Sequence, residues 1–128
     1  MIQSFKLSAG TGKCIIESIV VKCGKDLNVT IGGGEKYHIG AAAIAVPRFE
    51  YKENKKRTAS TSVICVHGHR EDELAYKAAK YLATSLDCIV SASIGIHIDN
   101  ITKEEYDQLL KNVDTILDDI IETITTIQ

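Results

Sequence analysis

The strongest constraint on the fold is a long amphipathic segment at the end of the chain. Apolar side chains recur there at helical spacing. Thr102 and Glu105 precede them with the spacing of a capping box, which fixes the start of a helix. We therefore expect a helix whose wide apolar stripe covers a sheet, a partner or both. The stripe consists of Tyr106, Leu109, Leu110, Val113, Ile116, Leu117, Ile120, Ile121, Ile124 and Ile127.

Upstream of this helix the sequence predicts a sheet and one further helix. Apolar runs rich in β-branched residues alternate with short glycine-containing turns. Leu74 to Leu86 has helical spacing, and Pro47 is expected to end the fourth strand. The order βββββαβα predicts one α+β domain over residues 1–128, with a mainly antiparallel sheet of about six strands and two helices on one face. The expected strands cover residues 5–7, 14–22, 27–31, 38–46, 61–66 and 89–98.

Composition narrows the class of protein. The net charge is −2 over 128 residues, so nothing favours binding to nucleic acid or to an anionic membrane. No apolar run approaches the roughly 20 residues that span a bilayer, and the first residues lack the order of a signal peptide. We expect a cytoplasmic protein.

The four cysteines are expected to be reduced thiols buried in the core. None belongs to a Cys-x-x-Cys pair, the usual mark of a zinc site, and each lies in or beside an apolar run. Cys65 in particular is expected to be a core residue of its strand. The four are Cys14, Cys23, Cys65 and Cys88.

The segment from Gly32 to Gly40 is a candidate functional segment, because the requirements of the fold alone do not explain its composition. Three consecutive glycines are followed by Tyr37 and His38. Glycine reaches positive φ without strain and lets the backbone approach a neighbour or a ligand closely. A hairpin connection would explain the glycines alone. The four histidines, however, all lie at expected strand ends, where one rim could gather them: His38, His67, His69 and His97.

Three kinds of site remain open for these residues. An anion site would use Arg70, the start of the following helix and the amides of the glycine loop. A metal site would use His38, His67, His69, His97 and Asp99. Acid–base catalysis would use a histidine near Asp99 or Glu35, although no motif indicates a serine or cysteine nucleophile.

Three segments resemble one protein family, in order and spacing over nearly the whole chain. They are residues 33–41, Gly-Gly-Glu-Lys-Tyr-His-Ile-Gly-Ala, residues 68–72, Gly-His-Arg-Glu-Asp, and residues 95–102, Gly-Ile-His-Ile-Asp-Asn-Ile-Thr. The chain is similar to the LpdD-like family of prenylated-flavin chaperones, the small accessory subunits associated with UbiD-type decarboxylases such as gallate decarboxylase. Arg70 replaces a lysine of the family's pattern and keeps its positive charge.

The resemblance implies a non-catalytic homodimer whose fold is similar to that of the small proteasome-assembly chaperones. Such a protein would bind prenylated FMN and deliver it to a UbiD-type decarboxylase, or stabilise that enzyme. Two alternatives are a dimeric assembly chaperone without a small-molecule ligand and a small histidine-based metal-binding enzyme. Under the leading hypothesis one pocket holds the flavin, and no metal ligand or catalytic residue is assigned. The expected cofactor-binding residues are Gly33, Gly34, Tyr37, His38, His69, Arg70, His97 and Asp99.

Overall fold

The computed structural model describes residues 1–50, 56–66, 68 and 71–127. The expected His67, His69 and Arg70 lie outside the described residues. Six strands and two α-helices follow in the predicted order, with one 3-10 turn at Gly12–Cys14. The strands are β1 (Ile2–Ala9), β2 (Ile16–Cys23), β3 (Asp26–Gly34), β4 (Ala41–Phe49), β5 (Arg57–Cys65) and β6 (Val90–His97), and the helices are α1 (Asp72–Leu86) and α2 (Lys103–Ile127).

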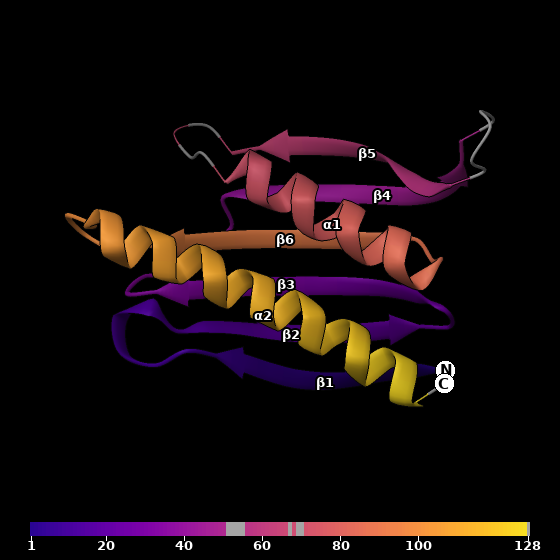
Figure 1. Ribbon diagram of the computed structural model, residues 1–128, viewed down its shortest axis with the longest axis horizontal. Helices are drawn as coiled ribbons and strands as arrows, with labels where there is room; N and C mark the ends of the chain where they lie inside the picture. Colours follow the sequence, from indigo (N-terminus) through magenta and orange to yellow (C-terminus); the bar gives the residue numbers. More distant parts are fainter. Residues whose placement is uncertain (51–55, 67, 69–70, 128) are drawn as a thin grey trace.

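The six strands form one sheet in the order β1-β2-β3-β6-β4-β5. Neighbouring strands are antiparallel except for β3 and β6, which run parallel. Both helices lie on one face of the sheet, with α1 over the β4–β5 half and α2 running diagonally over the β1–β2 half (Figure 1). The predicted α+β class and the helices on one face are therefore confirmed.

The predicted capping box starts α2. The amide of Glu105 donates to the Thr102 hydroxyl at 3.1 Å, and the amide of Thr102 donates to the Glu105 carboxylate at 2.9 Å. Most of the apolar stripe is then buried against the sheet, and this helix-covered face carries the core. Only the ends of the stripe, Tyr106 and Ile127, are more than half exposed. The stripe thus covers the chain's own sheet.

Strand β4 differs from its prediction at both ends. It begins at Ala41 instead of His38, and it continues through Pro47 to Phe49. Beyond Ala45, β4 has only β5 as a neighbour, because its pairing with β6 ends there. A proline without an N–H is tolerated where a strand is paired on one side only.

The second face of the sheet is left uncovered by both helices (Figure 1). Ile44 and Val46 of β4 are 48% and 46% exposed on this open face. The expectation of buried cysteines fails in part, because Cys23 and Cys65 are exposed and only Cys88 is buried.

No helix in the described part of the chain is long and apolar enough to cross a membrane.

Candidate functional site

The parallel pair β3 and β6 brings two of the predicted segments to one end of the sheet. Gly34, the last residue of β3, pairs with His97, the last residue of β6. The chain then turns across the end of β6, where the amides of Glu35 and Lys36 both donate to the His97 carbonyl, at 2.7 and 3.3 Å. The glycine loop and the Gly-Ile-His-Ile-Asp segment are therefore neighbours through backbone contacts.

Close packing at this strand end accounts for the glycines. Gly34 has a φ of +75°, and a Cβ there would lie 2.4 Å from the His97 carbonyl oxygen. A Cβ on Gly33 would lie 2.6 Å from the Ile15 carbonyl oxygen. No side chain fits at either position. The Gly34 amide donates to Ile15, so it is used in a protein hydrogen bond, as are the two amides that follow.

His38 lies in the loop between β3 and β4 and contacts the start of α1. Its Nε2 is 2.7 Å from Oε1 of Glu71, and the two side chains are only 17% and 12% exposed. The His38 backbone packs on Gly95 of β6, where a Cβ would collide with its carbonyl oxygen. Glu71 also lies against Gly40, since a Cβ there would be 2.2 Å from Oε2. Glu71 was not among the expected site residues.

His97 and Asp99 form a second histidine–carboxylate pair, in a more exposed position. Nε2 of His97 is 2.8 Å from Oδ1 of Asp99, and the backbone amide of Asp99 donates to Glu35 at 3.2 Å. The structure thus places His38, His97 and Asp99 at the same end of β6. Among the described residues, no three His, Cys, Asp or Glu side chains are grouped closely enough to hold a metal ion.

Tyr37 is directed away from this group. Its ring lies over Gly32, and its hydroxyl donates a short hydrogen bond to Glu17 of β2. That hydrogen bond, together with partial burial, raises the pKa of Tyr37 to about 12. Successive side chains of a strand point to opposite faces of the sheet. The neighbours of Glu17 in β2 and of Gly32 in β3 face the helices, so Glu17 and Gly32 themselves lie on the open face. Tyr37, which contacts both, therefore lies on the open face too. There it is separated from the helix-covered side.

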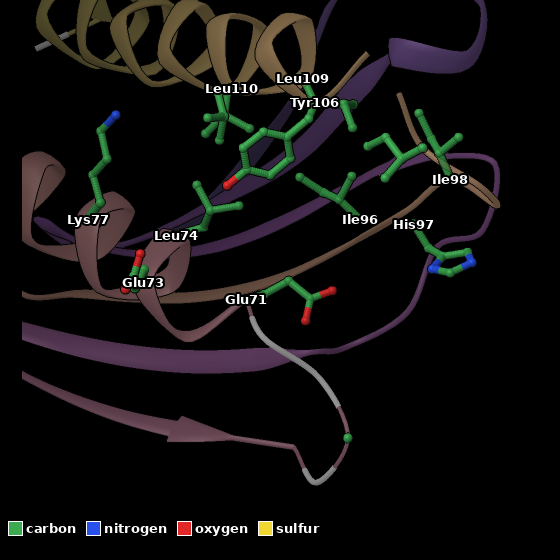
Figure 2. A pocket seen from close by; sticks show the side chains of 13 residues that line it. Glu71, Glu73, Leu74, Lys77, Ile96, His97, Ile98, Tyr106, Leu109 and Leu110 are labelled. Atoms are coloured by element: carbon green, nitrogen blue, oxygen red, sulfur yellow. The ribbon is translucent and has the colours of Figure 1, made fainter. Parts of the chain in front are cut away.

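A groove of about 680 Å³ opens between α1 and α2, beside the two histidine–carboxylate pairs. Tyr106 and Leu110 of α2 project toward Leu74 of α1, with Ile96 of β6 below them (Figure 2). Glu71 and His97 lie at one end (Figure 2). The volume and mainly apolar lining are those of a small-molecule site. Besides these six residues, the lining includes Gly68, Glu73, Lys77, Ile98, Ile101, Leu109 and Val113.

The sequence did not predict this groove, although it contained the helix stripes that build it. Among the described lining residues, only His97 was an expected site residue. Leu74, Leu109 and Leu110 were assigned to helix packing, because periodicity marks an apolar face and says nothing about a gap between two such faces.

Comparison with known families identifies the chain. Residues 10–125 match the family described as the prenylated flavin chaperone LpdD-like domain. The chain belongs to this family. A search of curated proteins found no match to this LpdD-like domain.

The fold is shared with a solved structure titled as a novel chaperone complex for yeast 20S proteasome assembly. The TM-score is 0.61 at 10% sequence identity, and the alignment covers 98% of this chain and 96% of the other. At that identity the likeness concerns the fold alone. It confirms the expected similarity between the LpdD-like domain and the small proteasome-assembly chaperones.

Proposed function

We propose that this chain is a non-catalytic accessory protein that binds prenylated FMN and delivers it to, or stabilises, a UbiD-type decarboxylase. The observation that carries the proposal is the groove between α1 and α2. The chain belongs to a family that is described as prenylated flavin chaperones. A volume of about 680 Å³ suits a ligand of flavin size.

The residues of the groove fit a flavin. Leu74, Leu110 and Ile96 provide apolar surface for a planar ring, and the Tyr106 ring is available for stacking. His97 lies at the rim, where it can donate a hydrogen bond to a polar edge of the ligand. When bound, the group would supply the prenylated ring system that the decarboxylase uses, and this chain would hold, orient and shield it.

Four of the expected binding residues take a positioning role in this proposal. Gly33 and Gly34 allow the β3 end to pack against β2 and β6, which sets the position of His97. His38 ties the loop to Glu71 at the groove rim. Tyr37, on the open face, is proposed to stabilise the loop that carries His38 instead of stacking on the ring.

Anaerobic titration with FMN and prenylated FMN tests the binding step. Co-purification with a UbiD-type decarboxylase, followed by a visible absorption spectrum of the complex, tests delivery. Saturable flavin binding together with cofactor transfer to the apo-decarboxylase is expected. A protein that associates with the decarboxylase but binds neither flavin would contradict the proposal.

A second candidate is a dimeric assembly chaperone without a small-molecule ligand. It is favoured by the open sheet face, because exposed apolar side chains such as Ile44 and Val46 are typical of a protein-binding surface. Self-association or partner binding without any flavin binding is the result that would select it.

A further inference from the structure

The groove between α1 and α2 is aliphatic inside and carries carboxylates, and these properties indicate which part of the ligand it binds. We propose that this groove recognises the planar ring system of the flavin, and its prenyl-derived part above all, while the phosphate stays outside. This inference rests on the proposed function, because it presumes that the ligand is a prenylated flavin.

The interior of the groove is built from aliphatic side chains. Leu109 and Val113 of α2 line the groove and are buried. Leu110 of α2 and Leu74 of α1 project toward each other across it (Figure 2). Ile96 closes the groove on the sheet side. Such a surface gains free energy from each apolar carbon that it removes from water, so it favours a ligand that carries an added prenyl group.

The charged side chains that line the groove disfavour the binding of a phosphate. The groove's described basic side chains already have carboxylate partners: Nζ of Lys77 is 2.5 Å from Oδ1 of Asp114, and Nε2 of His97 is 2.8 Å from Oδ1 of Asp99. Glu71 and Glu73 add negative charge at the start of α1. A dianion placed here would meet two carboxylates and would have to compete with two existing pairs. The phosphate is therefore accommodated outside the groove.

Tyr106, at the start of α2, is positioned to cover the ring. It follows the capping box directly, and its amide donates to the Thr102 carbonyl at 2.9 Å. The side chain lines the groove and is 51% exposed. An aromatic side chain has only two rotatable χ angles, so it loses little conformational entropy when a flat ligand stacks on it.

Titration of the wild type with both flavins tests the assignment. We expect prenylated FMN to bind about tenfold or more tightly than FMN, since the added carbons enter the groove. Leu110→Trp, which fills the groove, should reduce this preference to about twofold or less. Thr115→Trp is the matched control, because Thr115 is exposed on the same helix and does not line the groove. It should keep the preference, and circular dichroism checks that both variants fold.

Three further variants separate ring recognition from phosphate recognition. Tyr106→Leu should weaken the binding of both flavins, whereas Tyr106→Phe should restore it. Lys77→Met removes a groove cation and should change each dissociation constant by no more than about twofold. A tenfold loss in Lys77→Met would place the phosphate in the groove and overturn the inference.

The possible failures are distinguishable. Equal affinity of the wild type for FMN and prenylated FMN, or an unchanged preference in folded Leu110→Trp, would overturn the groove assignment while the proposed function stands. Failure of the wild type to bind either flavin would overturn the proposed function and this inference with it.

Discussion

His38 and Glu71 are 33 residues apart in the chain, yet Nε2 and Oε1 lie 2.7 Å apart in a largely buried contact. This contact joins the β3–β4 loop to the start of α1, and it borders the groove through Glu71. A hydrogen bond to a charged group in such a place contributes more than an exposed pair does.

Breaking this contact should destabilise the domain. We expect His38→Ala to lower the free energy of unfolding by about 1.5–3 kcal/mol, because the Glu71 carboxylate loses a partner while it stays buried. His97→Ala removes the exposed pair with Asp99 and should cost less than about 1 kcal/mol. Urea denaturation followed by circular dichroism compares the two, and equal losses would show that burial does not strengthen the His38 contact.

The positive charge of Arg70 should matter for flavin binding. Arg70 lies outside the described residues, and its role stays a prediction from the sequence. If it binds the phosphate, Arg70→Ala should weaken flavin binding by about ten- to a hundredfold, and more than His38→Ala does. Isothermal titration measures both variants. Equal affinities for the wild type and Arg70→Ala would remove the phosphate role from this residue.

The homodimer remains a prediction, but the structure changes the surface that it should use. The α2 stripe is buried within the chain, whereas Ile19, Ile44, Val46 and Ile64 are exposed on the open sheet face. Ile44→Glu should therefore convert a dimer into a monomer. Light scattering at tens of micromolar tests this, with Tyr76→Glu on α1 as the control. A monomeric wild type would refute the dimer.

The four thiols should differ in reactivity. Burial, followed by the nearby charges of Asp26 and Asp87, raises the pKa of Cys88 to about 11. Its thiol therefore stays protonated at mildly alkaline pH, where thiolates react, and only at higher pH should its rate rise. Ellman titration of native protein should modify the exposed Cys23 and Cys65 first. Denatured, non-reduced protein should yield all four thiols, and a deficit of two would indicate a disulfide.

Local patterns determined much of the fold in advance. The Thr102–Glu105 capping box, the α2 stripe and the glycine-containing turn between β2 and β3 each depend on residues close in sequence, so periodicity and turn chemistry suffice to predict them. The element order then restricted the architecture to a sheet with helices on one face.

The candidate site depended on strand order, which the sequence does not reveal. Because β6 inserts between β3 and β4, His97 meets Gly34 and the His38 backbone meets Gly95. The same order places β4 beside β6 and lets Pro47 lie where pairing has become one-sided.

The sequence by itself determined which residues can form helices, strands and caps, because those preferences act over a few residues. Only the tertiary structure decided that Tyr37 bonds to Glu17 on the open face, that His38 meets Glu71, and that two helix stripes leave a groove between them. Each of these results from contacts between distant segments. Such contacts depend on how whole elements pack, and no local preference encodes them.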